Sequence, residues 1–394
     1  MKAVAAMEHA GVPIDGPSHS RLVGTWEDLR RQIVREVDQD YGVFEGATFK
    51  TNLFEQWLRT QGLDWPRLAS GKPALDDETF RERAKLYPQV APLREVRSTL
   101  SQLRPADLAV GPDNRNRCLL SPFRSKTGRN QPSASRFIFG PSTWLRGLIR
   151  PEHGTGIAYL DWGQQEFGIA AALSGDEAMM RAYRSGDPYL EFGKMAGAIP
   201  SDATKASHPR ERELYKTVVL AVQYQMGVGS LGRRLNLSEF EAKLLLDAHR
   251  SIFRKFWRWS DAAVDYGVLD RRLFTVFGWD LHVTSQTKPR TLRNFPMQAN
   301  AAEMLRLAIC LAFERGVRVV APVHDALMIE APIGELEHAV SVTQGAMAEA
   351  SEVVLLGFRL GVDVYVVSYP DRYTDPRGER MWQLVMGLLE KRNR

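Results

Sequence analysis

The feature that most restricts the fold is a long helical block at residues 175–260, which separates two β-favouring parts of the chain. Before it, the apolar run Ile157–Leu160 predicts a short buried strand. After it, Val317–Val323 and Ala326–Glu330 form two β-like runs. Residues 1–110 are expected to be mainly helical. The sequence therefore predicts an α+β protein, whose sheet collects strands that lie far apart in the chain.

The other segments predict mostly helices. Gly11 ends a short first helix as a left-handed cap, and residues 111–150 are irregular. Helices are predicted near residues 20–40, 52–61, 76–86, 92–103, 166–173, 238–256, 297–315 and 381–391, with a hairpin at 272–283 and a strand at 358–368.

Positive charge is concentrated in one part of the chain. The formal net charge is only +5, but between Arg94 and Arg150 eleven Lys or Arg residues face three acids. Pro, Gly and Ser make much of this segment a loop. A basic loop is often an ordinary solvated surface, but this excess favours a phosphate backbone as partner.

Several other classes of protein are disfavoured. Cys118 and Cys310 form neither a disulfide framework nor a metal-ligand spacing, so reduced thiols in a cytoplasmic protein are expected. Lys2, Glu8 and His9 interrupt the first residues, which therefore do not resemble a signal peptide. Because no apolar run approaches the length of a bilayer span, no membrane partner is expected.

One helix carries a stripe of functional side chains. Arg212, Lys216, Leu220 and Tyr224 recur every four residues, which places them along one side, about 6 Å apart. Arg212 and Lys216 could grip neighbouring phosphates, and Tyr224 lies where a base could stack. Such cations are usually solvated surface charges, but Val218–Val222 makes this helix largely apolar. The stripe therefore predicts a site for a polyanionic ligand that carries a base.

Two aspartates fall where predicted strands end. Asp161 follows the first apolar run, and Asp325 follows His324 between the later two. Each could be an ordinary cap or turn residue. Carboxylates from distant strand ends can also hold two Mg²⁺ ions about 3.5–4 Å apart, as nucleotidyl transfer requires. We therefore predict two Mg²⁺ ions at Asp161 and Asp325, with Mn²⁺ as a possible substitute.

Taken together, these segments resemble the polymerase domain of family A DNA polymerases, the class of bacterial DNA polymerase I. The similar stretches are MEHAGVPID (7–15), KTGRNQPS (126–133), YLDWGQQEFGIAAALSGD (159–176), RELYKTVVLAVQYQMGVGSLGRRL (212–235), RTLRNFPMQANAAEML (290–305) and VHDALMIEAP (323–332). The resemblance implies a right-hand architecture with an antiparallel-sheet palm, helical fingers and a helical thumb. It also implies template-directed addition of deoxynucleotides to a primer 3′-hydroxyl.

The resemblance assigns roles to individual residues. Asp161 and Asp325 would hold the metal, and Lys216 would also stabilise the leaving pyrophosphate. The implied nucleotide-binding residues are Arg212, Lys216, Leu220, Tyr224, Glu166, Gln164 and Tyr189, and the implied primer-template-binding residues are Arg129, Asn294, Gln298 and His324. Glu166 would block a ribose 2′-hydroxyl, so the implied partners are primer-template DNA and deoxynucleoside triphosphates, besides replication or repair proteins left open.

The implied domains follow the chain in five parts. They are an N-terminal lead-in and thumb at 1–110, a first part of the palm at 111–174, fingers at 175–270, a second part of the palm at 271–368 and a C-terminal extension at 369–394. No proofreading exonuclease or flap nuclease is expected.

The sequence departs from the family pattern at four positions. Ala326 stands where most members have a glutamate, and Leu220 replaces an aromatic residue beside the sugar. Gln225 replaces a glycine, and Tyr189 replaces a histidine that helps hold the triphosphate. We therefore expect activity with altered metal or rate behaviour, and sugar discrimination becomes an open point.

Two alternatives remain open at this stage. A single-subunit RNA polymerase shares the Arg-x3-Lys-x7-Tyr spacing and often lacks a glutamate after His-Asp, but Glu166 favours deoxynucleotides. A non-catalytic nucleic-acid clamp of the same fold would explain Ala326 and Leu220. Against the clamp, both metal aspartates and both phosphate-binding cations remain.

Overall fold

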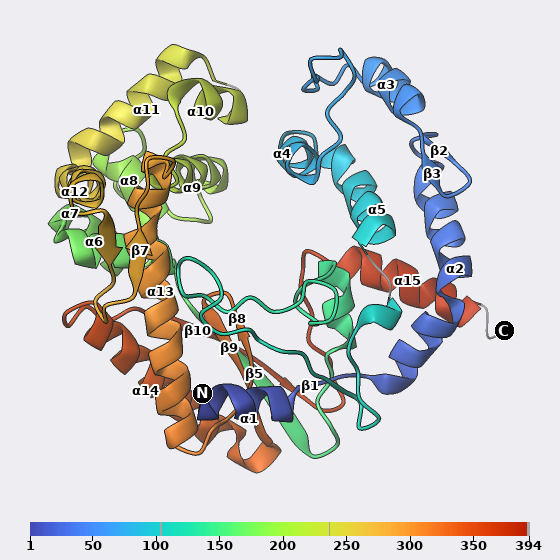
Figure 1. Cartoon of the computed structure of the whole chain (residues 1–394). Coiled ribbons are helices and arrows are strands. Elements are labelled where there is room, and N and C mark those ends of the chain that lie inside the picture. The colour runs from blue at the N-terminus through green and yellow to red at the C-terminus, as the bar shows by residue number, and fades with distance from the viewer. Residues whose placement is uncertain (103–104, 236, 392–394) are drawn as a thin grey trace.

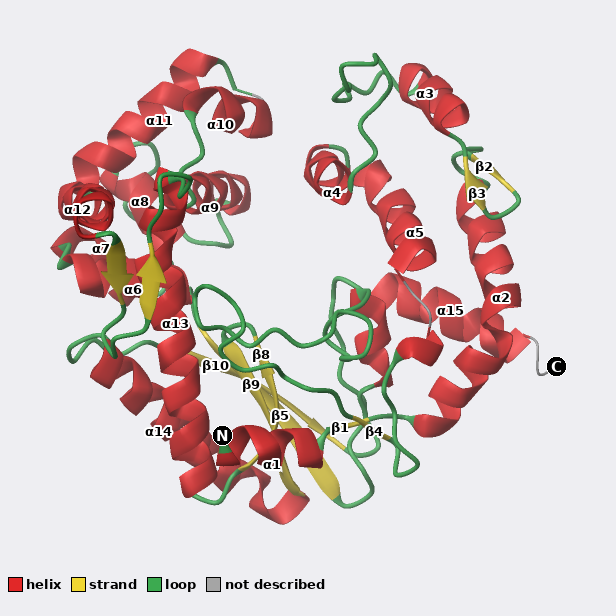
Figure 2. Cartoon of the chain, in the orientation of Figure 1, coloured by secondary structure: helices red, strands yellow, loops and turns green. Residues whose placement is uncertain are grey.

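The structure, a computed structural model, describes residues 1–102, 105–235 and 237–391. Two helical arms rise from opposite sides of a base that contains the main sheet, and the arms stand apart (Figure 1). Helices dominate and the sheets are small and antiparallel (Figure 2). The predicted α+β class is confirmed.

The sheet of the base has four antiparallel strands in the order β10-β5-β9-β8. Their bounds are Thr155–Trp162 for β5, Arg318–Val323 for β8, Ala326–Pro332 for β9 and Val362–Ser368 for β10. All four were predicted, but β5 continues past Leu160 to Trp162, and β10 begins only at Val362. Strands β5, β9 and β8 are mostly buried, whereas the edge strand β10 is mostly exposed.

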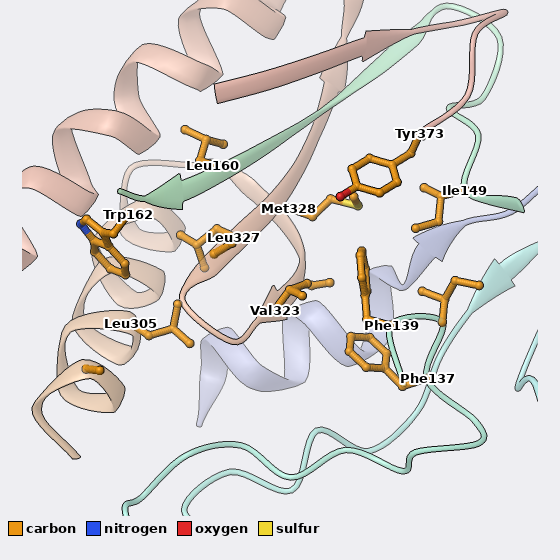
Figure 3. Packing of buried hydrophobic residues seen from close by; sticks show 14 of the residues in the cluster. Phe137, Phe139, Ile149, Leu160, Trp162, Leu305, Val323, Leu327, Met328 and Tyr373 are labelled. Atoms are coloured by element: carbon orange, nitrogen blue, oxygen red, sulfur yellow. The ribbon is translucent and has the colours of Figure 1, made fainter. Parts of the chain in front are cut away.

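Three helices pack around this sheet. They are α1 (Lys2–Ala10) on β8, α14 (Leu336–Val354) on β5 and β9, and α13 (Pro289–Glu314), which packs on α14 and β8. The helix α14 was not predicted, and α13 begins well before residue 297 because Pro289 starts its first turn. On one face of the sheet, Phe137, Phe139 and Tyr373 gather beside Met328 and Ile149 (Figure 3).

The first helix ends at Ala10, as predicted, but its cap differs. Gly11 has φ 66° and ψ 168°, so its φ is positive while its ψ lies outside the left-handed helical region. A Cβ atom on Gly11 would lie 2.7 Å from Arg117 Cγ and 2.8 Å from the Asn116 carbonyl oxygen. Glycine is therefore required here for two reasons: the backbone has a positive φ, and neighbouring atoms leave no room for a Cβ atom. The next residues form β1 (Val12–Pro13), which pairs with β4 (Arg115–Asn116).

One arm is built from residues that follow α1. Its elements are α2 (Gly16–Asp38), the hairpin β2 (Phe44–Glu45) and β3 (Thr48–Phe49), α3 (Thr51–Thr60), α4 (Asp77–Leu86) and α5 (Ala91–Gln102). The helix α2 begins earlier than predicted because Asp15 accepts the Ser18 N–H and Pro17 lies in the first turn. Leu103, the predicted end of the last helix, lies outside the described residues.

The other arm continues the chain after β5. Its helices are α6 (Gln165–Ser174), α7 (Glu177–Arg184), α8 (Pro188–Met195), α9 (Pro209–Gln223), α10 (Val228–Leu235), α11 (Glu239–Ile252) and α12 (Arg254–Asp270), followed by the hairpin β6 (Arg272–Phe274) and β7 (Asp280–His282). Ser238 and Glu241 form a capping box that starts α11. The single helix predicted for 238–256 is wrong, because the chain leaves helical geometry at the fully buried Phe253.

The C-terminal residues fasten the first arm to the base. Helix α15 (Glu379–Lys391) packs against α2 and against the 3₁₀ segment Thr143–Leu148, labelled η3. The Trp382 ring lies 6.4 Å from the buried Trp144 ring. Among the described residues, no helix is long and apolar enough to cross a membrane.

A buried carboxylate in the first arm makes stability depend on pH. One oxygen of Glu95, on α5, is buried without a hydrogen-bond partner. Burial raises its pKa to about 7, although Arg380 and Arg94 oppose the rise. Between the ordinary value of 4.5 and about 7, the folded protein keeps a proton that the unfolded chain has released. Stability therefore falls as pH rises through this window.

We expect Glu95→Gln to remove this fall, so that the variant unfolds at a higher temperature than the wild type at pH 8. Thermal unfolding at pH 5, 6, 7 and 8 measures the difference. Glu36→Gln, at an exposed position of α2, is the control and should keep the wild-type pH dependence. If the unfolding temperatures of wild type and Glu95→Gln change with pH in parallel, the expectation is contradicted.

Candidate active site

The two predicted metal ligands lie together at one end of β5 and β9. In the antiparallel register Asp161 is directly opposite Ala326, and Asp325 is the residue before it, in the turn that joins β8 to β9. The Trp162 N–H donates to the Asp325 carbonyl oxygen at 3.4 Å. His324 occupies the same turn with φ 55°. The turn therefore brings the second aspartate beside the first.

The electrostatics of this pair fit a divalent cation. One oxygen of Asp161 is buried and has no hydrogen-bond partner. Burial, and then the charges of Asp325 and Asp363, raise the pKa of Asp161 to about 7. Burial also raises the pKa of Asp325. Negative charge at this place needs a counterion, and Mg²⁺ prefers carboxylate oxygens while keeping several waters.

Among the described residues, no group of three or more His, Cys, Asp or Glu side chains is arranged to hold a metal ion by itself. A site with two aspartates leaves coordination positions for water and for phosphate oxygens. This is the usual manner in which proteins bind Mg²⁺ with a phosphorylated substrate.

Asp363 is a neighbouring carboxylate that the sequence analysis missed. It lies on β10 directly opposite Asp161, on the side of β5 away from Ala326. Residues directly opposite in a sheet point to the same face, so its charge acts on Asp161. The strand was predicted from its β-favouring residues, but its register was not, and the register selects the residue that faces Asp161.

A second group joins four segments that lie far apart in the chain. The Tyr224 hydroxyl donates to the Glu166 carboxylate, and Arg129 Nη2 lies 3.5 Å from Glu166 Oε1. Glu166 lies in the first turn of α6. Gln164 is the N-cap of this helix and has a left-handed backbone conformation. Gln298 of α13 hydrogen-bonds the Tyr224 side chain, and burial raises the pKa of that phenol. The structure thus brings together four of the predicted nucleotide and primer-template residues.

The predicted stripe lies on α9, with one change. Arg212, Lys216 and Leu220 belong to the helix, but Tyr224 is its C-terminal cap, with φ −84° and ψ 15°. The buried residues of α9 include Val218, Val219 and Val222, whereas the Lys216 side chain is 40% exposed. Lys216 is therefore accessible, while the buried valines hold the helix against the rest of the arm.

Arg212 already has an anionic partner. Its guanidinium donates to the Asp187 carboxylate and lies 5.7 Å from the centre of the buried Tyr189 ring. Asp187 caps α8 through the Leu190 N–H, so the contact joins α8 to α9. Tyr189 and Arg212 are thus neighbours in the structure. In the sequence, Asp187 followed by Pro188 indicates a helix cap, but it gives no indication of the ion pair with Arg212.

The remaining predicted residues lie on α13 and in the β8–β9 turn. Asn294 is buried, with a side-chain oxygen that lacks a hydrogen-bond partner, one turn before Gln298. His324 lies at an exposed position of the turn. Partial burial is the largest cause that lowers its pKa; the charges of Arg129, Arg146 and Arg377 add to this effect, and Asp325 opposes it.

An acidic pair on a small antiparallel sheet at the base of two helical arms, one of which carries the cations of α9, is the arrangement of a right-hand polymerase domain. Residues 140–368 match the model of the family described as DNA polymerase family A. The chain belongs to this family, as the resemblance implied.

Relatives and a solved structure extend this result. The chain is 28% identical over 220 residues to "DNA polymerase I, thermostable" of Thermus thermophilus, which covers 52% of the chain and 26% of that protein. It is 24% identical over 390 residues to DNA polymerase I of Chloroflexus aurantiacus, which covers 91% of the chain and 40% of that protein. The chain therefore spans well under half the length of these relatives.

The fold is also similar to a solved structure described as the POL domain of Pol1 from M. smegmatis in complex with DNA primer-template and dNTP. The TM-score is 0.73 at 20% identity, over 93% of this chain and 68% of that one. This likeness supports the right-hand fold.

Proposed function

We propose that this chain is a template-directed DNA polymerase, which adds deoxynucleotides to a primer 3′-hydroxyl by two-metal nucleotidyl transfer. The proposal depends on one observation: Asp161 and Asp325 lie side by side at the ends of β5 and β9, and one buried oxygen of Asp161 has no hydrogen-bond partner. Family membership and the named ligands of the M. smegmatis structure support it.

The domain roles follow from this proposal. Residues 1–110 form the lead-in and thumb, 175–270 the fingers, and 111–174 with 271–368 the palm. Asp161 and Asp325 would hold two Mg²⁺ ions, or Mn²⁺ in their place. When bound, the ions activate the attacking hydroxyl and neutralise charge on the leaving pyrophosphate. Proofreading and flap-nuclease activities are not proposed for this chain.

The side chains of α9 handle the triphosphate in this proposal. Arg212 exchanges its Asp187 carboxylate for phosphate oxygens, which preserves a charge-assisted contact. Lys216, which is 40% exposed, supplies a second cation one turn away and faces the leaving pyrophosphate. Tyr189 packs under Arg212 and fixes its position. Positioning and charge neutralisation supply most of the catalysis in phosphate chemistry of this kind.

Primer extension tests the proposed function. A labelled primer on a longer template, with Mg²⁺ and either dNTPs or NTPs, should be extended with dNTPs. Preference for NTPs would indicate a single-subunit RNA polymerase instead. Binding of primer-template without extension under Mg²⁺ or Mn²⁺ would indicate the non-catalytic clamp.

Glu166→Ala is expected to raise ribonucleotide incorporation relative to deoxynucleotide incorporation by about tenfold or more, since a steric contact in a pocket is worth roughly 1–3 kcal/mol. Glu166 is held in place by Tyr224 and Arg129, so its carboxylate has a defined position beside the nucleotide. Single-nucleotide incorporation with dNTP and the matching NTP measures the ratio.

Glu166→Gln keeps the size of the side chain and should keep most of the discrimination. Glu177→Ala, at an exposed position of α7, is the surface control. If Glu166→Ala leaves the NTP-to-dNTP ratio at the wild-type value, Glu166 is not the sugar gate.

A further inference from the structure

The loop at residues 369–378 lies beyond the family match, which ends at residue 368. After β10 this loop returns across the sheet rather than leaving it. The Tyr373 N–H donates to the Ile149 carbonyl oxygen at 2.9 Å, and the Tyr373 ring packs 5.7 Å from the Tyr159 ring. Figure 3 shows Tyr373 beside Met328 and Phe139, over the strands.

This contact places the loop on the catalytic face of the sheet. Tyr159 and Asp161 are two residues apart on β5, so their side chains share one face and are separated by about 7 Å along the strand. Tyr365 of β10 is directly opposite Tyr159, and its ring also packs on Tyr373. The loop therefore borders the same surface that carries the acidic pair.

A buried carboxylate in this loop holds two arginines. Asp375 is 6% exposed and accepts Arg146 Nη1 at 2.7 Å. It also accepts Arg377 Nε at 2.9 Å and Arg377 Nη2 at 2.7 Å. Two guanidinium groups share one carboxylate, so one positive charge is left over. The paired contact also fixes the orientation of Arg377, which lowers the entropic cost of using it.

Arg377 is nevertheless open to solvent. Its side chain is 72% exposed, whereas that of Arg146 is 10% exposed. It follows Asp375 in the loop whose Tyr373 ring packs on Tyr159, and Tyr159 lies two residues before Asp161 on the same face of β5. An oriented, exposed and only partly neutralised guanidinium near the acidic pair is suited to a phosphate oxygen.

We propose that Arg377 binds a backbone phosphate of the primer strand, a few nucleotides from its 3′ end. The loop at 369–378 then forms part of the DNA-binding surface, and Asp375 and Arg146 are the residues that position Arg377. This inference rests on the proposed polymerase function.

The experiment measures binding of primer-template DNA to the full chain as a function of salt. The variants are Arg377→Ala, Arg377→Lys and the control Lys391→Ala, which removes an exposed cation at the far end of α15. Loss of one phosphate contact should reduce the slope of log affinity against log salt by about 1. We expect this change for Arg377→Ala, a smaller one for Arg377→Lys and none for Lys391→Ala.

A second readout locates the contact. Uncharged methylphosphonate linkages are placed one at a time at the last six primer phosphates. For the wild type, one linkage should weaken binding more than its neighbours do, and Arg377→Ala should lose this sensitivity at that linkage alone. A merely structural role for Arg377 would change thermal stability without changing either the salt slope or the linkage profile.

The outcomes separate the two proposals. Wild-type protein that binds and extends the primer, with an unchanged slope and profile in Arg377→Ala, overturns the role of Arg377 alone. Wild-type protein that does not bind primer-template overturns the proposed function together with it. A change of slope that is equal in Arg377→Ala and Lys391→Ala also counts against a specific contact.

Discussion

Asp325→Asn is expected to reduce primer extension by at least about a thousandfold, because the proposed metal site would lose one of its two ligands and with it several kcal/mol of charge stabilisation. Primer-template binding should change little, since basic residues elsewhere hold the backbone. The substitution is nearly isosteric, and Asp325 lies in a tight turn beside Asp161, so the fold should persist. Single-turnover extension and equilibrium DNA binding measure the two quantities.

Asp202→Asn, at an exposed loop position, is the matched control and should extend the primer as the wild type does. Asp161→Asn should reproduce the loss. Wild-type rates in Asp325→Asn would remove Asp325 from the metal site and the two-metal mechanism with it.

Glu330→Ala is expected to lower the free energy of unfolding by about 3–5 kcal/mol, because it removes the buried carboxylate and leaves the buried Arg115 guanidinium with only the more exposed Glu152 as an anionic partner. Glu330 on β9 is 3% exposed and accepts Arg115, which is 4% exposed. Arg115 also donates to the carbonyl oxygens of Ala10 and Gly11. This ion pair therefore connects the chain after α1 to the centre of the sheet.

Denaturant unfolding measures the change, with Glu152→Ala as the control. Glu152 also contacts Arg115, but its side chain is 56% exposed, so its loss should cost less than about 1 kcal/mol. In the double variant Arg115→Leu/Glu330→Leu, much of the stability should return, because no unpaired charge remains. A loss of under 1 kcal/mol in Glu330→Ala would contradict the account.

Local patterns in the sequence predicted much of the fold correctly. The strands around Asp161 and Asp325, the hairpin near 272–283 and the start of α11 at Ser238 all follow from periodicity, turn residues and capping. Signals of this kind reside in a few neighbouring residues, so they can be read without knowing the fold. The missed helix α14 carries few such signals, since Glu335 caps it without a side-chain hydrogen bond.

The features of the candidate site also fall into two groups, those that the sequence indicated and those that only the tertiary structure set. The sequence alone determined the residue types, their spacing on α9 and the two strand-end aspartates, because helix and strand periods are local properties. Tertiary structure alone decided that Asp363 faces Asp161, that Asp187 holds Arg212 and that the loop at 369–378 packs Tyr373 on Tyr159. Strand register and ion pairs between elements depend on how separate segments pack together, and no local pattern encodes that packing.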